Sequence, residues 1–121
     1  MNEDRRVEVR LTRNAIANIR EIRAYSTDRW GESVATKYLD ELEGALSRIA
    51  SDGSLLQPLP DVSPAVQYYR INKHLIVCDV ADGSVVVLAV LHVSMDLPTR
   101  LAELQPTLSN EVELLHRQLR P

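Results

Sequence analysis

The longest apolar run of the chain, VVVLAVL at residues 85–91, constrains the fold more than any other feature. A strand with one face in water alternates polar and apolar side chains, whereas this run does not alternate. We therefore expect a central β-strand that is covered on both faces. A transmembrane helix needs ~20 apolar residues, so this run is too short to cross a bilayer, and we expect no integral membrane protein.

Three short runs in the second half of the chain have the composition of β-strands. They read VQYYRIN at 66–72, HLIVCDV at 74–80 and VVVLAVL, and they are rich in β-branched and aromatic residues. The Asp82-Gly83 pair between the last two runs is a hairpin signal. These features predict a three-stranded antiparallel meander. Near the start of the chain, RVEVRL at 6–11 alternates polar and apolar residues and predicts a further strand.

Two amphipathic helices are expected between the first strand and the meander. Thr12 stands where an N-cap should be, and apolar residues follow at helical spacing, which predicts a helix over 13–28. The buried stripe of this helix is expected to contain Ile16, Ile19, Ile22 and Tyr25. Gly31 interrupts the pattern, and a second helix is expected over 32–51. Because the turn is short, the two helices should form an antiparallel hairpin.

The stretch after the second helix is expected to be a loop. Pro58, Pro60 and Pro64 are incompatible with a regular helix or a central strand. The helical hairpin can cover only one face of the predicted sheet. The other face must be covered by the C-terminal tail, by another copy of the chain or by a partner.

The C-terminal tail predicts an amphipathic helix. Asp96 is placed to cap a first helical segment with Pro98 in its first turn, and a terminal helix is expected to begin at Ser109 or Asn110. Its apolar stripe consists of Leu108, Val112, Leu115 and Leu119. This stripe could lie on the open face of the sheet or in a partner's groove on the hairpin. We favour the sheet face, because the run at 85–91 requires cover on both sides.

Length, charge and cysteine content narrow the class of protein. A chain of 121 residues is the size of one domain. The N-terminus lacks the apolar core of a secretory signal, so we expect a cytoplasmic protein. Cys78 is the only cysteine and lies in an apolar run, which indicates a buried structural thiol. The net charge is −3, and residues 53–121 hold five Lys and Arg against seven Asp and Glu, so direct nucleic-acid binding is not expected.

Motifs for several kinds of chemistry are missing from the sequence. His74, His92 and His116 lie on three separate elements without the spacing of metal ligands, so neither a metal site nor a cofactor is expected. The four glycines are isolated and form no phosphate-binding loop. Ser94, His92 and Asp96 lie two apart on one extended segment, without an oxyanion hole or a nucleophile elbow, and do not predict a catalytic triad.

The order of elements and a set of short motifs resemble the ParE branch of the RelE/ParE toxin superfamily. The resemblance covers about residues 7–101, and the string LHVSMD at 91–96, preceded by an arginine and a histidine four residues apart, carries most of it. The family signature is found at Trp30, Gly31, Arg70, His74, His92, Met95 and Asp96, with further matches at Leu11, Thr12, Ala15, Arg29, Ala35, Tyr38, Leu39, Leu42, Ile76 and Leu91. Cys78 and Asp79 depart from the aromatic-rich segment usual in the family.

The resemblance implies both fold and function. The expected fold is α+β: an N-terminal strand, a helical hairpin and the meander in one mostly antiparallel four-stranded sheet, with a C-terminal helix. Residues 1–105 would form the toxin domain and residues 106–121 an extension. The implied function is a type II toxin that binds and inhibits DNA gyrase without turnover and is neutralised by a ParD-like ribbon-helix-helix antitoxin. The alternatives are a RelE-like ribosome-dependent mRNA endoribonuclease that uses Arg70, His74 and His92, and a non-toxic interaction protein.

Individual motif residues are expected to have mainly structural roles. His92 should end the strand with its ring bonded to backbone or to Asp96, the alternative being a general acid or base. Met95 is expected to fill the core, Asp96 to cap a helix, and Trp30 to anchor the helical hairpin in the core. Three apolar residues off the main stripes of the hairpin either form an antitoxin-binding groove or complete the core: Ala24, Ala35 and Leu39.

Overall fold

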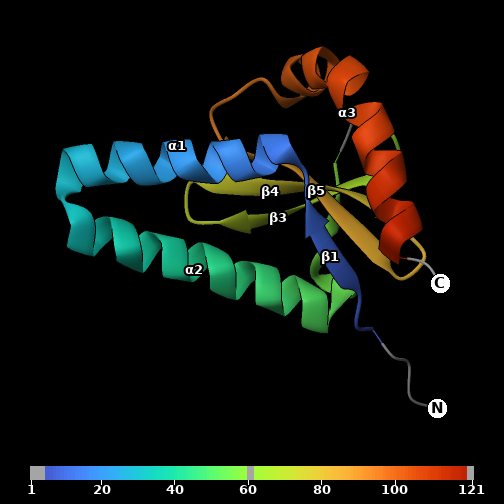
Figure 1. Ribbon diagram of the computed structural model, residues 1–121, viewed down its shortest axis with the longest axis horizontal. Helices are drawn as coiled ribbons and strands as arrows, with labels where there is room; N and C mark the ends of the chain where they lie inside the picture. The colour runs from blue at the N-terminus through green and yellow to red at the C-terminus, as the bar shows by residue number, and fades with distance from the viewer. Residues whose placement is uncertain (1–4, 60–61, 120–121) are drawn as a thin grey trace.

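A mixed sheet with the strand order β1-β5-β4-β3-β2 organises the part of the chain that the computed structural model describes, residues 5–59 and 62–119 (Figure 1). The elements in chain order are β1 (Glu8–Leu11), α1 (Arg13–Trp30), α2 (Glu32–Ser51), the 3₁₀ turn η1 (Gly53–Leu55), β2 (Gln57–Pro58), β3 (Val66–Ile71), β4 (His74–Ala81), β5 (Ser84–His92) and α3 (Leu97–Leu119). The expected α+β fold, with a first strand, a helical hairpin and an antiparallel meander, is confirmed. Within these ranges no helix combines the length and apolarity needed to cross a membrane.

Strand β5 is the centre of the fold and is buried on both faces, as its sequence predicts. Every residue from Ser84 to Leu91 is buried. On one face, β5 and β4 pack under the helical hairpin in the hairpin-side cluster, which consists of Ala15, Leu42, Ala45, Ile49, Leu56, Ile76, Cys78, Val85, Val87 and Val90. On the other face they pack under α3 in the α3-side cluster, which consists of Val66, Leu75, Val77, Leu88, Ala89, Leu91, Leu101 and Leu108. The expectation that the tail covers the open sheet face is confirmed.

Helix α3 is continuous, whereas the sequence predicted a separate helix from Ser109 or Asn110. Pro106 lies inside α3 and cannot donate the usual backbone hydrogen bond, and Figure 1 shows that the helix bends between its two halves. Leu101 and Leu108, on either side of the proline, are both buried against the sheet. The apolar contacts therefore hold both halves in place across the weak point. The proposed division between residues 105 and 106 falls within this helix and stays a prediction.

Two polar contacts fix the second half of α3. The Glu111 carboxylate accepts a hydrogen bond of 3.0 Å from the backbone N–H of Arg13, at the first turn of α1. The His116 ring lies between Ser84 Oγ, 2.5 Å from Nδ1, and Asp79 Oδ1, 2.9 Å from Nε2. Ser84 is only 1% exposed, so this Ser-His-Asp chain cannot reach a substrate and ties α3 to the sheet.

The predicted loop contains a short edge strand that the sequence did not reveal. Gln57 and Pro58 pair with Tyr68 and Gln67 of β3, which makes the sheet of the described residues five-stranded instead of four-stranded. Proline is tolerated there because an edge strand can leave one side of its backbone unpaired. Pro60 lies outside the described residues.

The thiol of Cys78 is structural, as expected. Cys78 is fully buried in the hairpin-side cluster. Burial, together with the nearby Asp79 carboxylate, raises the pKa of the thiol to about 12. The thiolate is therefore not populated at neutral pH, and the side chain acts as a small apolar group.

Strand β5 contains a bulge exactly where its neighbour β1 ends. Strand β1 runs parallel to β5 and pairs with it only as far as Val87. The register between β4 and β5 shifts at the same level, because Val77 pairs with Ala89 while Cys78 pairs with Val87. Leu88 is the extra residue, and both Leu88 and Ala89 face α3.

Side chains of the first helix replace β1 beyond this point. Thr12 Oγ1 and Asn14 Nδ2 each donate a hydrogen bond of 3.0 Å to the Leu88 carbonyl, and Asn18 Oδ1 accepts one of 3.0 Å from the Val90 N–H. Thr12 also accepts from the Ala15 N–H at 3.0 Å and so is the N-cap of α1, as predicted. The three side chains attach α1 directly to the backbone of β5.

Replacing Asn18 with alanine should destabilise the fold. Asn18 is 8% exposed, and its loss leaves the Val90 N–H without this acceptor, which should lower the free energy of unfolding by about 1–3 kcal/mol. Asn14→Ala is the matched control and should cost about 0.5–1 kcal/mol, because Thr12 still serves the Leu88 carbonyl. Urea unfolding of both variants measures the difference, and equal losses would contradict this role of Asn18.

Candidate functional site

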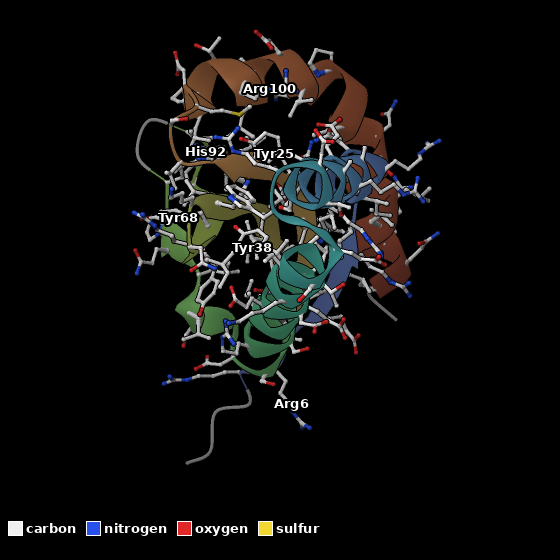
Figure 2. All side chains as sticks on the ribbon, turned by 90° about the vertical axis from the view of Figure 1, so that its left-hand side faces the viewer. Arg6, Tyr25, Tyr38, Tyr68, His92 and Arg100 are labelled. Atoms are coloured by element: carbon white, nitrogen blue, oxygen red, sulfur yellow. The ribbon has the colours of Figure 1, made fainter. Side chains whose placement is uncertain are left out.

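A groove of about 940 Å³ lies between the far end of the helical hairpin and the end of the sheet where β5 leads into α3. Figure 2 looks onto this end of the molecule, with Arg100, His92, Tyr25 and Tyr38 among the labelled side chains. The lining residues are Asn18, Glu21, Ile22, Tyr25, Ser26, Arg29, Trp30, Val34, Tyr38, Asn72, Lys73, His74, Val90, Leu91, His92, Met95 and Arg100. They come from α1, α2, β5, the β3–β4 hairpin and the start of α3.

Two histidines and a tyrosine meet at the floor of this groove. His74 begins β4 and pairs with His92 at the end of β5, so their rings lie 5.5 Å apart, edge to face. Tyr38 reaches them from α2, with its hydroxyl 2.5 Å from Nδ1 of His74. Strand register therefore brings together two residues that are separated by a whole hairpin in the sequence.

The electrostatics of the groove favour a neutral His74 ring and a protonated Tyr38 phenol. Burial, and secondarily the neighbouring His92, lowers the pKa of His74. Burial and the Glu41 carboxylate raise the pKa of Tyr38, so its phenol stays protonated and can donate to Nδ1 of His74. That hydrogen bond leaves the proton of the neutral imidazole on Nε2.

The His92 ring is held by the turn that follows its strand. The Ser94 N–H donates to Nδ1 of His92 at 3.1 Å, and the Ser94 hydroxyl lies 2.7 Å from the same nitrogen. Nδ1 is thus an acceptor, and Nε2 carries the proton. His92 ends its strand with the ring bonded to backbone, which was one of the two expected arrangements, and the backbone group is the Ser94 N–H.

The walls of the groove combine positive charge with exposed apolar side chains. The described residues that line the groove include three cations, Arg29, Lys73 and Arg100, and one carboxylate, Glu21. Arg29 and Lys73 form no ion pair within the described ranges, and Nε of Arg100 is buried without a hydrogen-bond partner. Seven large apolar side chains are exposed in the described chain, and four of them lie here: Tyr25, Trp30, Val34 and Met95.

Some of the signature residues are in the groove and others have structural roles. Trp30, His74, His92 and Met95 line the groove. Asp96 caps α3 as predicted, because its carboxylate accepts from the Thr99 N–H at 3.4 Å and from the Thr99 hydroxyl at 2.9 Å.

The other two signature residues lie outside the groove. Gly31 joins α1 to α2 with φ of 94°, a conformation that favours glycine. Arg70 is exposed, donates to the Asn72 carbonyl at 2.9 Å and does not line the groove.

Two predictions about the groove residues were wrong. Trp30 is 57% exposed instead of anchoring the core, and it packs edge to face on Tyr25 with 5.7 Å between ring centroids. Met95 is 44% exposed instead of filling the core. Figure 1 shows that the turn of the helical hairpin extends past the end of the sheet, and Trp30 is the last residue of α1 before that turn.

The predicted buried stripe of α1 was also partly wrong. Ile16 and Tyr25 are exposed, whereas the buried residues of this helix are Ala15, Asn18 and Ser26. Ile19 and Ile22 are partly buried against the hairpin-side cluster. A polar inner face is stable here because Asn18 bonds the β5 backbone.

The three residues suggested for antitoxin binding do not form one surface. Ala35 is 1% exposed and completes the core, which was the alternative interpretation. Leu39 is partly buried against the hairpin-side cluster, and Ala24 is exposed. None of the three lines the groove. Within the described ranges, no group of three His, Cys, Asp or Glu residues could hold a metal ion.

Two solved structures share the fold of this chain. A chain of a structure described as the chromosomal ParDE TA system from P. aeruginosa superimposes with a TM-score of 0.62 at 15% identity, over 71% of this chain and 95% of that chain. A chain of the toxin-antitoxin complex RelBE2 from Mycobacterium tuberculosis gives a TM-score of 0.54 at 16% identity, over 76% and 97%.

Sequence comparisons give the family. Residues 9–97 match the family described as the ParE toxin of the type II toxin-antitoxin system parDE. Toxin ParE of Escherichia coli is 33% identical over 94 residues, which are 77% of this chain and 91% of that protein. Toxin ParE1 of Mycobacterium tuberculosis is 30% identical over 92 residues, 75% of this chain and 94% of that protein. The chain belongs to the ParE toxin family, and the resemblance inferred from its motifs is confirmed.

Replacing Trp30 with alanine should barely change stability. Its ring is more than half exposed, so we expect the free energy of unfolding to fall by about 0.5 kcal/mol or less. Leu42→Ala, at a residue only 2% exposed, is the control and should cost about 2–5 kcal/mol. Unfolding must be followed by circular dichroism, because Trp30 is the only tryptophan. A loss near that of Leu42→Ala would show that Trp30 anchors the core after all.

The lowered pKa of His74 should make stability depend on pH. Below the unfolded pKa of about 6.5, the unfolded chain binds a proton that folded His74 resists, so the free energy of unfolding should fall as pH decreases from about 7 towards 5. His74→Gln should make this decrease shallower. Urea unfolding at several pH values measures both slopes, and parallel curves for the two proteins would refute the assignment.

Proposed function

We propose that this chain is the toxin of a ParDE-like module, that it inhibits DNA gyrase by binding it, and that it acts in the cytoplasm without catalytic turnover. Family membership supports the toxin assignment. The observation that carries the binding mechanism is the groove, whose walls offer exposed aromatic and aliphatic side chains beside the cations Arg29, Lys73 and Arg100. Such a surface is typical of a site for another protein.

The same groove is poorly equipped to cleave RNA. A metal-independent nuclease must stabilise a developing phosphorane with several cations while a base and an acid move protons. Arg70, one of the three residues of the nuclease alternative, does not line the groove and donates to the Asn72 carbonyl. His74 and His92 each have one ring nitrogen occupied, by Tyr38 and Ser94. A low density of cations also limits the affinity for RNA.

A ParD-like antitoxin, with a ribbon-helix-helix DNA-binding part, is the proposed partner that neutralises the toxin. Structures similar to this chain come from a ParDE system and from a RelBE2 toxin-antitoxin complex. Because α3 occupies one face of the sheet, the outer surface of the hairpin around Ala24, together with the groove, remains for a partner segment. An extended or helical segment that orders on binding would suit this surface.

The nuclease alternative still has one observation in its favour. His74 and His92 are adjacent, and Lys73 and Arg100 line the same groove. An acid, a base and two cations at one place are the minimum for phosphodiester cleavage. The third alternative, a non-toxic interaction protein, predicts neither gyrase inhibition nor cleavage.

Gyrase inhibition with matched variants tests the proposal. We expect the purified protein to inhibit supercoiling of relaxed plasmid. The double variant His74→Gln/His92→Gln should keep most of that inhibition, because glutamine keeps a polar side chain at both positions of the groove floor and no proton transfer is needed. Trp30→Ala should weaken inhibition roughly 10-fold, the loss expected when one aromatic contact of about 1.4 kcal/mol is removed from an interface.

A parallel assay on translating ribosomes separates the alternatives. Cleavage of mRNA that is lost in His74→Gln/His92→Gln, with no effect on gyrase, would establish the nuclease. Absence of both activities in the folded protein would leave only the interaction role.

A further inference from the structure

The charge of the groove contrasts with that of the whole chain. The protein carries a formal charge of −3, yet the groove has three cationic side chains against one carboxylate among the described residues that line it. Arg29 and Lys73 have no carboxylate partner within the described ranges, and Arg100 has one, Glu103, at 3.5 Å. The excess of positive charge therefore indicates an anionic ligand.

Arg100 is the most specific element of this charge. Its Nε lies buried without a hydrogen-bond partner, and its only described ion pair is a long contact of 3.5 Å to Glu103. The Nε atom is closed to solvent while the side chain as a whole is 42% exposed, so a ligand carboxylate would meet the exposed part of the side chain and not Nε. The backbone of Arg100 is fixed by the first turn of α3, where its N–H donates to the Asp96 carbonyl at 3.0 Å. The side chain thus starts from a rigid position.

The apolar part of the groove lies next to these cations. Tyr25 and Trp30 form an edge-to-face pair, and the Arg29 guanidinium lies 5.8 Å from the centroid of the Trp30 ring. Val34 and Met95 add exposed aliphatic surface. A flexible methionine beside aromatic rings can adapt to a large side chain of a partner.

We propose that the groove binds an acidic peptide segment of a protein partner, which carries at least one large apolar side chain. The apolar side chain packs among Tyr25, Trp30 and Met95, and the carboxylates pair with Lys73 and Arg100. This inference rests on the proposed function in taking the partner to be a protein, and it extends that function by naming the chemistry of the segment and the residues that hold it.

A single-stranded nucleic acid fits these observations less well. Nucleic-acid grooves combine a continuous track of cations with aromatic platforms for successive bases. Here the aliphatic side chains of Val34, Met95 and Ile22 form much of the wall, and Glu21 interrupts the positive charge.

Arg100 lies just beyond the part of the chain that matches the family. The match ends at residue 97, and Arg100 is on the helix that covers the sheet. Helix α3 thus has two roles: its buried side completes the core, and its first turn supplies a cation to the groove.

Selection from a random peptide library displayed on phage tests the proposal without knowledge of the partner. Panning on the full chain should enrich peptides that contain Asp or Glu together with a large apolar residue. A synthetic copy of an enriched peptide should bind roughly 10- to 100-fold more weakly to Lys73→Glu/Arg100→Glu, the loss expected when two charge pairs become repulsive. Panning on that variant should enrich basic peptides instead.

Arg20→Glu/Arg23→Glu is the matched control, because it makes the same charge change on exposed residues of α1 outside the groove and should leave binding unchanged. Thermal unfolding checks that each variant is folded, and Lys73→Gln/Arg100→Gln replaces the reversal variant if that one fails to fold.

Three outcomes would overturn the proposal: no enriched peptide, enriched peptides without an acidic excess, or equal loss of binding in the control. Displacement of the peptide by a 15-nucleotide single-stranded DNA at lower concentration than the free peptide would assign the groove to nucleic acid. Gyrase assays remain independent, since a chain that selects acidic peptides but does not inhibit gyrase refutes the proposed target and not the groove.

Discussion

The backbone of β5 must be hydrogen-bonded along both edges, because burial on both faces excludes water from it. Strand β4 satisfies one edge, but β1 satisfies the other only to Val87. Thr12, Asn14 and Asn18 complete it from α1. This attachment fixes where the helical hairpin lies on the sheet. It thereby sets how far the hairpin projects beyond the strands, and the projecting end carries Tyr25 and Trp30 into the groove.

The second face of β5 must also be shielded from water, and α3 of the same chain covers it. The matched part of the E. coli relative is 91% of that protein, while the family match stops at residue 97 of this chain. Most of α3 therefore lies outside the part of the chain that matches the family. Apolar packing at Leu101 and Leu108 holds the helix, and Glu111 and His116 fix its second half. A partner that approaches this chain meets α3 on one face, so the surface of the hairpin and the groove is what remains open.

The sequence predicts the fold well wherever the hydrophobic period alone determines structure. The unbroken apolar run at 85–91 correctly predicted a strand that is covered on both faces. The helical hairpin and the meander were predicted from apolar residues that recur every 3.6 and every 2 positions. The prediction from sequence fails where a polar contact between distant residues determines whether a side chain is buried. From the sequence, Asn18 would be placed on the surface, because an asparagine on a helix is usually exposed. Its hydrogen-bond partner is the Val90 N–H, 72 residues away, and local sequence does not reveal such a contact. Trp30 reads as a core residue, because periodicity does not reveal that the helices are longer than the sheet beneath them.

The string LHVSMD at 91–96 shows how structural and binding roles combine in one turn. Leu91 ends the buried part of β5, and His92 is locked by Ser94 beside His74. Asp96 caps α3 and so fixes the turn from which Arg100 projects. Met95, between these constrained residues, has no packing partner that buries it and faces the groove. A sequence pattern of this kind marks the site because the residues that end the strand and start the helix also determine which side chains are left to meet a partner.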